Sequence, residues 1–183
     1  MRAELVERAQ RGDQLAFSEL VLLDADRCYA IAYRILRDVE RAEDAVQEAL
    51  LLAWRDVHQL RDPERYGPWL HRLVVNACYA EARRHRRWSG HVRALALDAP
   101  YGPDPIVSVH DRDALERAFA ELSPEQRAVF VLHHHVGQSL EAIAEVLEVP
   151  LGTVKSRLHY ATRVLRGAIT LGELAEDRRR GTA

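Results

Sequence analysis

A pair of amphipathic segments interrupted by a proline, within residues 139–166, constrains the fold of this 183-residue chain more than any other stretch. The first segment, 140–147, places apolar side chains at positions i, i+3, i+4 and i+7 of one helical face. Ser139 precedes it as a candidate N-cap. Residues 148–150 (EVP) then interrupt the pattern, because proline does not continue a helix interior but fits a helix start. The sequence therefore predicts two short helices joined by a tight turn.

The second of these helices, predicted from about residue 151, is basic on its outer face. Its inward positions are apolar, and residues 151–166 include no acid. Cationic and hydroxyl-bearing side chains on the outer face suit a groove lined with phosphates. The pair predicts a helix-turn-helix that reads DNA, although a helical hairpin with a solvated basic face has the same periodicity. Glu148 stands where such turns often have glycine, because a left-handed backbone costs other residues about 1 kcal/mol.

Composition and charge exclude several classes of protein. The chain is 48% hydrophobic and 30% charged, so it is expected to fold, as one medium domain or two small ones. No apolar run is long enough to span a membrane, and the N-terminus does not resemble a signal peptide, so we expect a cytoplasmic protein without membrane insertion. Cys28 and Cys78 are isolated, which indicates neither a disulfide framework nor a zinc site. The net charge of −2 is unusual for a protein that binds nucleic acid, so the distribution of charge matters more than its sum.

A helix predicted at about 39–60 has an acidic flank. Six acids and two arginines lie between Asp38 and Asp56, beside a broad apolar stripe. Asp44, Gln47 and Glu48 lie to one side of that stripe, three and four residues apart. A solvated acidic face is the commoner explanation of such a pattern. Because acids repel DNA, however, an acidic helix within a DNA-binding protein is expected to face a protein partner.

A further helix is predicted from Trp69 to a run of arginines at 83–88 (RRHRRW). Four arginines and an aromatic side chain suit phosphates and unpaired bases, although cations at a helix end also suit the helix dipole. Asn76 lies in the middle of this helix, where asparagine is a mediocre helix former. It either satisfies a local backbone group or presents its amide to a base edge.

The regular pattern fails from Ser89 to about Asp111, a stretch that is rich in proline and glycine at 99–105. Residues 123–126 (SPEQ) then predict a new helix with a capping box. We therefore expect an all-α protein of two small helical domains joined by a flexible linker. The predicted parts are a first domain at 1–90, a linker at 91–111, a helix-turn-helix domain at 112–170 and a frayed tail at 171–183.

His133, His134 and His135 raise the hypothesis of a metal site. Consecutive helical residues point about 100° apart, so three in a row do not converge on one ion without ligands from elsewhere. We expect these histidines to be partly buried or to face a partner, and we expect no metal and no other cofactor. No glycine-rich phosphate loop, nucleophile elbow or paired-carboxylate site stands out, so no catalytic residue is predicted.

Four segments in the same order resemble the RNA polymerase sigma factor family, in its extracytoplasmic-function (ECF) group. The resemblance covers about residues 12–166. It rests on GDQLAFSEL, RAEDAVQEALLLAWR, PWLHRLVVNACYAEARRHRR and LSPEQRAVFVLHHHVGQSLEAIAEVLEVPLGTVKSRLHYA. Glu148, His159 and Tyr160 depart from the family's usual residues, which bears on the DNA sequence preferred rather than on the fold.

The resemblance implies three surfaces. The acidic helix resembles the family's docking surface for the coiled coil of the polymerase β′ subunit, which assigns Asp44, Gln47 and Glu48 to that interface. The loop and helix around Trp69 resemble the reader of the −10 promoter element, whose candidate residues are Arg65, Trp69, Asn76, Arg83, Arg84, Arg86 and Arg87. The second helix of the helix-turn-helix resembles the −35 reader, whose candidate residues are Thr153, Lys155, Ser156, Arg157, His159, Tyr160 and Arg163.

By this resemblance we expect a sigma factor, not an enzyme, that binds core polymerase through its β′ and β subunits. It would recognise the −35 and −10 elements of promoter DNA and support promoter melting. Many ECF factors are held inactive by an anti-sigma protein, so an anti-sigma factor is a further candidate partner. One alternative is a one-component helix-turn-helix transcription regulator, which leaves the acidic helix and Asn76 unexplained. The other is a polymerase-binding adaptor without initiation activity, which has no need of Lys155, Ser156 and Arg157.

Overall fold

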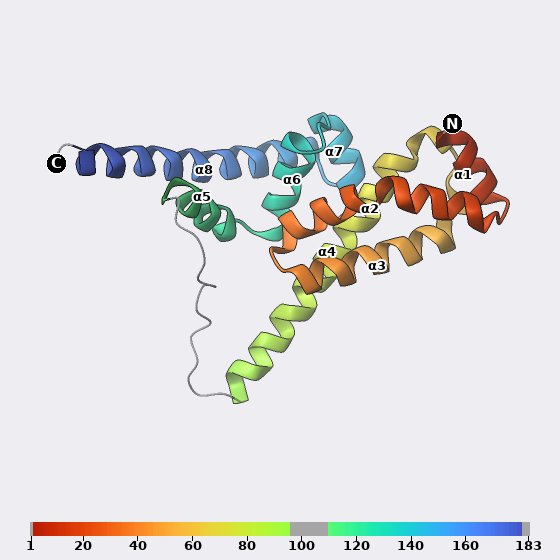
Figure 1. Ribbon diagram of the computed structural model, residues 1–183, viewed down its shortest axis with the longest axis horizontal. Coiled ribbons are helices and arrows are strands. Elements are labelled where there is room, and N and C mark those ends of the chain that lie inside the picture. The colour runs from red at the N-terminus through yellow and green to blue at the C-terminus, as the bar shows by residue number, and fades with distance from the viewer. Residues whose placement is uncertain (1, 96–109, 181–183) are drawn as a thin grey trace.

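The computed structural model describes residues 2–95 and 110–180 (Figure 1). Within these ranges the chain forms α-helices and two short 3₁₀ turns and contains no β-strand, so the all-α prediction is confirmed. The elements are α1 (Arg2–Gln10), α2 (Gln14–Leu36), α3 (Val39–Asp56), η1 (Val57–Gln59), η2 (Pro63–Arg65), α4 (Tyr66–Leu95), α5 (His110–Glu121), α6 (Pro124–His134), α7 (Leu140–Leu147) and α8 (Leu151–Arg180). The elements α1–α4 are called the N-terminal half below, and α5–α8 the C-terminal half. α8 runs away from α1 toward the opposite end of the molecule, and α4 projects to one side (Figure 1).

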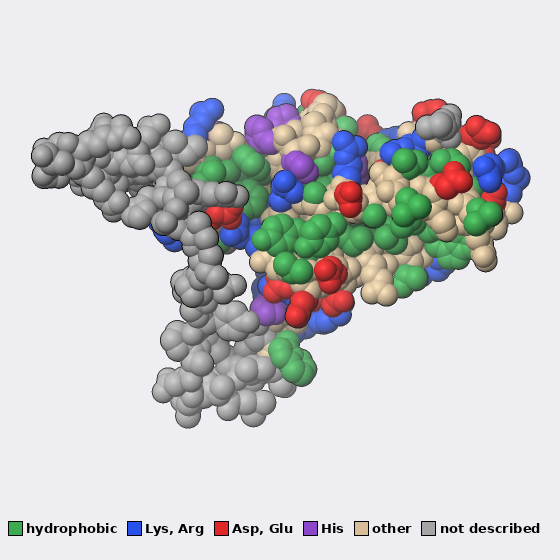
Figure 2. Space-filling view, in the orientation of Figure 1, with side chains coloured by type: hydrophobic (Ala, Val, Ile, Leu, Met, Phe, Trp, Pro, Cys, Tyr) green, Lys and Arg blue, Asp and Glu red, His purple; other side chains and the backbone are tan. Residues whose placement is uncertain are grey.

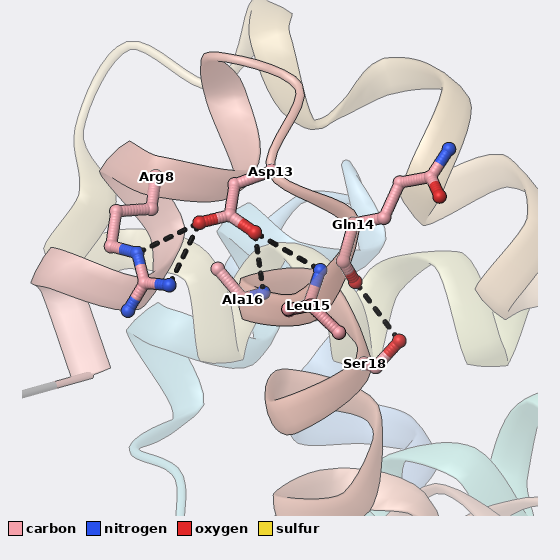
Figure 3. Close-up of polar contacts among 6 residues, drawn as sticks. All are labelled: Arg8, Asp13, Gln14, Leu15, Ala16 and Ser18. Carbon is pink, nitrogen blue, oxygen red and sulfur yellow. Dashed lines mark hydrogen bonds and ion pairs between the residues drawn. The ribbon is translucent and has the colours of Figure 1, made fainter.

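The break between α1 and α2 is fixed by local hydrogen bonds (Figure 3). Asp13 caps α2, because one carboxylate oxygen accepts from the amides of Leu15 and Ala16 at 3.0 and 3.1 Å. The other oxygen accepts from the Arg8 guanidinium at 2.9 and 2.8 Å. The hydrogen bond from the Ala16 amide and then that from Arg8 lower the pKa of Asp13. Gly12 turns the chain just before the cap at a φ of 89°, which favours glycine.

Small side chains bring α3 close to its neighbours. Ala42, Ala45, Ala49 and Ala53 are buried on its inner face, and α3 packs against both α2 and α4. The helix predicted at about 39–60 ends earlier, at Asp56, and continues as a single 3₁₀ turn. Because the inner face is nearly all alanine, the helix axes approach closely and the polar flank of α3 stays at the surface.

The predicted helix-turn-helix is present as α7 and α8. The Ser139 hydroxyl accepts from the amide of Ala142 at 3.1 Å, as the predicted N-cap requires. Glu148 ends α7 in the left-handed conformation at a φ of 52°, so the turn keeps the shape that glycine usually provides. The predicted capping box of α6 is also present, with Ser123 and Gln126 bonded reciprocally.

Two predicted boundaries were wrong. The sequence predicts an end to helical pattern at Ser89, but α4 continues to Leu95 and α5 already begins at His110. Once a helix is established, extending it through weak formers such as Ser89 and Gly90 costs only about 1 kcal/mol per residue. The remainder of the predicted linker, 96–109, lies outside the described residues.

The frayed tail predicted after residue 170 is also not observed, because α8 continues as one helix to Arg180. The sequence of this stretch, LGELAEDRRR, combines good helix formers with arginines in the last turn, where cations suit the helix dipole. Residues 181–183 lie outside the described part of the chain.

The two halves of the molecule share one hydrophobic core, which the sequence did not predict. Val129 and Leu132 of α6 and Ile143 and Val146 of α7 belong to the same buried cluster as the interior of α1–α4. α6 packs against α2, and both α6 and α7 pack against α4. A second, smaller cluster joins α5 to α8 through Ala118, Leu122, Ala161 and Leu165. The helix-turn-helix is therefore held against the N-terminal half.

Candidate nucleic-acid and protein interfaces

The outer face of α3 carries the three residues predicted to dock a protein. Asp44, Gln47 and Glu48 are all exposed, and Figure 2 shows acidic side chains gathered over the first part of this helix. Leu51, one turn further on, is 60% exposed. Trp54 packs on Phe17 with 5.0 Å between ring centroids and remains partly exposed. An acidic surface bordered by apolar side chains fits a basic protein partner better than DNA.

One face of α4 brings together most of the residues predicted to contact the −10 element. At about 100° per residue, positions separated by three, four or seven residues lie on one side of the helix. The residues of this face are Trp69, Arg72, Asn76, Arg83 and Arg87. Arg84 and Arg86 lie on opposite sides of this face, each turned about 80° from its centre. Asn76 is exposed between Arg72 and Arg83, a position from which its amide can reach a ligand.

Two surface hollows mark this face. The first, of about 530 Å³, is lined by Ala80, Arg83, Arg84, Arg87 and Trp88. Trp88 is 72% exposed there, so an aromatic ring and several guanidinium groups share one open surface. This combination suits the stacking of an unpaired base beside a phosphate backbone.

The second hollow, of about 410 Å³, lies where η2 meets the start of α4. Arg65, Trp69 and Arg72 line it, together with Arg61 and Asp62. Trp69 is held by the ring of Tyr66, which is buried, with 5.8 Å between the centroids. The sequence prediction omitted Arg72, although its spacing of three residues from Trp69 and four from Asn76 was a usable signal.

The N-terminal part of α8 exposes most of the predicted −35 residues. Val154, Ala161 and Leu165 are buried on the inner face, so the opposite face points outward. The outward face consists of Ser156, His159, Tyr160 and Arg163, with Lys155 at its edge. The Arg163 guanidinium lies 5.3 Å from the centroid of the Tyr160 ring, which stiffens both side chains.

Arg157 and Thr153 lie to the other side of that face and are only half-exposed. Arg157 lies close enough to Tyr79 of α4 and Glu125 of α6 to interact with both electrostatically. Burial raises the pKa of Tyr79, and Arg157 opposes that shift. In this arrangement Arg157 is therefore turned toward the boundary between the two halves, and the prediction of a base-contacting role has the least support at this residue.

The three consecutive histidines diverge, as helical geometry requires. His133 Nδ1 lies 3.0 Å from the Gln138 carbonyl oxygen, which fixes the loop after α6. His134 packs on the Phe130 ring, and His135 is exposed. In the part of the chain that the structure describes, no three His, Cys, Asp or Glu side chains are grouped closely enough to hold a metal ion.

A different histidine, His71 of α4, lies in the contact between the two halves. It is only 6% exposed, and its Nδ1 lies 3.1 Å from Nε2 of Gln138. The Gln138 amide donates to Nδ1, which requires the neutral ring. Burial, and secondarily Arg27 and Arg2, lowers the pKa of His71 to about 4. The sequence alone gave no signal for this contact.

Acidification is expected to destabilise the protein through His71. In the unfolded chain its pKa is near 6.5, so between about pH 6.5 and 4 the unfolded state binds the proton and the folded state does not. Lowering the pH from 7 to 5 should therefore reduce the free energy of unfolding by about 2 kcal/mol from this residue. Urea unfolding at both pH values checks this, with His71→Gln as the comparison. If the free energy of unfolding of His71→Gln falls as much between pH 7 and 5 as that of the wild type, His71 is not the group responsible.

No helix in the described ranges is long and apolar enough to cross a membrane.

Comparison with known proteins identifies both halves of the chain. Residues 20–88 match the family described as Sigma-70 region 2, and residues 112–163 match Sigma-70, region 4. The −10 candidates therefore fall within the first match and the −35 candidates within the second.

Several known proteins are similar to this chain over most of its length and most of their own. The ECF RNA polymerase sigma factor SigL of Mycobacterium tuberculosis (strain ATCC 25618 / H37Rv) is 39% identical over 150 residues, which are 80% of this chain and 84% of that protein. The ECF RNA polymerase sigma factor SigW of Bacillus subtilis (strain 168) is 27% identical over 173 residues, 88% of this chain and 92% of that one. The solved structure of the sigma factor RpoE in complex with the anti-sigma factor NepR from Bartonella quintana matches with a TM-score of 0.65 at 25% identity, covering 84% of this chain and 96% of that one. This chain therefore belongs to the ECF group of RNA polymerase sigma factors, which recognise promoters.

Proposed function

We propose that this sigma factor uses three separate surfaces, one for polymerase and two for DNA. The exposed face of α3, with Asp44, Gln47 and Glu48, docks on the β′ subunit of core polymerase. The β subunit is a second contact in the assembled enzyme. Residues 1–90 form the −10 domain and residues 112–170 the −35 domain. The observation that carries the proposal is the separation of charge, with exposed acids on α3 and exposed arginines along one face of α4.

The −10 surface captures bases from the melted strand. Asn76 reads one base edge, the ring of Trp69 provides an apolar wall, and the arginines at 83, 84, 86 and 87 hold the backbone. Base flipping and backbone contacts are available only after the duplex opens, so their binding energy favours the open complex. The protein contributes no covalent chemistry and needs no cofactor.

The −35 surface is the outer face of α8. Ser156, His159, Tyr160 and Arg163 point outward at its N-terminal part, the part that enters the major groove in a helix-turn-helix. Lys155 adds a phosphate contact at the edge of this face, and Arg157, turned toward the boundary between the halves, contributes less. Each of the two surfaces binds DNA weakly alone, but their combined affinity for one promoter is high once polymerase holds both on it.

We also propose that an anti-sigma factor regulates this protein. This proposal is supported by the similar sigma factor RpoE from Bartonella quintana, whose structure was solved in complex with the anti-sigma factor NepR. The assembly with polymerase and chromosomal DNA would place the protein in the cytoplasm.

Permanganate footprinting tests the −10 surface directly. Core polymerase with the wild-type protein should make thymines near the −10 element reactive on a promoter selected from a library. Asn76→Ala is expected to reduce that reactivity about tenfold, because a missing base contact costs roughly 1–3 kcal/mol. Gln59→Ala, an exposed amide on η1, is the matched control. Equal reactivity for Asn76→Ala and the control would remove Asn76 from the reading surface.

A further inference from the structure

A hollow of about 730 Å³ lies where the end of α2 meets α5, α6 and α8. Sites that bind small molecules in proteins have volumes of about 300–1,000 Å³, so this hollow is large enough for such a ligand. The residues that line it include none of the docking residues on α3 and none of the −10 and −35 candidates. The function proposed above therefore gives this hollow no role.

Aromatic and apolar side chains of α5 and α6 form walls of the hollow. The rings of Phe119 and Phe130 meet edge to face with 5.7 Å between their centroids, and the His134 ring lies 4.5 Å from that of Phe130. Both phenylalanines are only partly buried, and Leu115, which also lines the hollow, is 38% exposed. A flat apolar body that enters the hollow removes these side chains from water, which favours its binding.

The charged groups that line the hollow are mostly cationic. Among the described residues they are Arg34, Arg37, Arg166 and a single acid, Glu116. Arg37 bonds Glu116 at 2.7 Å, and its guanidinium lies 5.9 Å from the centroid of the Phe119 ring. The one carboxylate of the lining is therefore already paired, and the arginines leave the hollow with an excess of positive charge. That excess suits an anionic ligand.

Arg34 is the arginine best placed to hold an anion in this hollow. It is exposed near the end of α2 and donates one N–H to the carbonyl oxygen of Ala30 at 3.0 Å. A guanidinium has five N–H donors in a fixed fork, which matches the two oxygens of a carboxylate. Burial, and then the charge of Arg34, lowers the pKa of His135, so Arg34 lies near a neutral ring of the same lining.

We propose that this hollow binds a small organic anion with a flat aromatic body and one carboxylate. The aromatic body packs among Leu115, Phe119 and Phe130, and the carboxylate accepts hydrogen bonds from the Arg34 guanidinium. Because the ligand contacts α2 together with α5 and α6, it binds the folded chain and not the unfolded one, and so it stabilises the fold. The site is independent of the polymerase and DNA surfaces proposed above.

Calorimetric titration of the full-length protein with 2-naphthoate tests the class of ligand. We expect saturable binding of one 2-naphthoate per chain. We also expect at least tenfold weaker binding of 2-naphthamide, which has a similar shape without the charge. Arg34→Gln should weaken the binding of 2-naphthoate at least tenfold, because the charge-assisted hydrogen bonds are lost. Arg11→Gln, which removes an exposed cation between α1 and α2, is the control and should bind like the wild type.

Fluorine NMR of the same protein locates the bound ligand. The chain contains three phenylalanines, of which Phe119 and Phe130 line the hollow and Phe17 packs on Trp54 elsewhere. In protein labelled with 4-fluorophenylalanine, 2-naphthoate should shift the signals of Phe119 and Phe130 and leave that of Phe17, identified with Phe17→Leu, in place.

Four results would each overturn the proposal. They are a lack of saturable binding, equal affinities for 2-naphthoate and 2-naphthamide, equal affinities of Arg34→Gln and Arg11→Gln for 2-naphthoate, and unmoved signals of Phe119 and Phe130 when 2-naphthoate saturates the protein.

Discussion

Replacing Asp44 and Glu48 with arginine is expected to abolish promoter-dependent transcription while leaving the fold intact. Both side chains are exposed on α3 and belong to no part of the core, so the substitution alters the surface alone. Against a basic partner, each reversal turns an attraction into a repulsion, and like charges across an interface cost several kcal/mol. Affinity for core polymerase should fall by about 100-fold or more, with circular dichroism unchanged.

The comparison for this prediction is Glu7→Arg/Asp26→Arg, which makes the same change in net charge on exposed positions of α1 and α2. Affinity is measured by fluorescence anisotropy of labelled protein titrated with core polymerase. If the α3 variant and the comparison bind core polymerase equally well, the docking surface lies elsewhere. Leu51→Ala should cause a smaller loss, because it removes an apolar side chain without introducing repulsion.

Replacing Lys155 and Arg163 with alanine is expected to reduce initiation about tenfold or more on promoters that require a −35 element. Both side chains are exposed along the outer face of α8. Each phosphate-binding cation that is removed should reduce the magnitude of the slope of log DNA affinity against log salt concentration by about one. The double variant should therefore reduce it by about two. Arg11→Ala/Arg27→Ala removes two exposed cations elsewhere and is the control.

Comparing two promoters, one that requires a −35 element and one that does not, shows whether Lys155 and Arg163 act at the −35 element. On a template whose initiation does not require a −35 element, the α8 variant should be as active as the control. Loss of activity on both templates would indicate a role of these cations in polymerase binding or folding instead. Arg157→Ala gives a useful contrast, since its position beside Tyr79 and Glu125 predicts a smaller effect than that of Arg163→Ala.

The helices could be predicted from sequence where local chemistry determines them. The turn at Gly12 and Asp13, the cap at Ser139 and the capping box at Ser123 each depend on residues a few positions apart. The helix-turn-helix followed from apolar spacing, and Glu148 adopts the left-handed turn despite its side chain. The ends of α4 and α8 were predicted too early, because an established helix extends through residues that would not start one.

The contact between the halves could not be predicted in the same way. Glu145 and Glu148 are ordinary exposed acids on an amphipathic helix, and only the fold places them on Arg65 and Arg72. His71 and Gln138 likewise come from positions 67 residues apart. Such pairs depend on how two separately patterned halves dock, and periodicity within each half carries no information about that.

Run-off transcription with core polymerase on a promoter library tests the central claim most directly. The wild-type protein should direct transcripts from a defined set of templates that share −35 and −10 sequences, and core polymerase alone should not. Omitting either element from a selected template should abolish its transcript. Binding to core polymerase without any specific transcript would contradict the claim and favour an adaptor. Specific binding to duplex DNA without binding to core polymerase would contradict it as well and favour a one-component regulator.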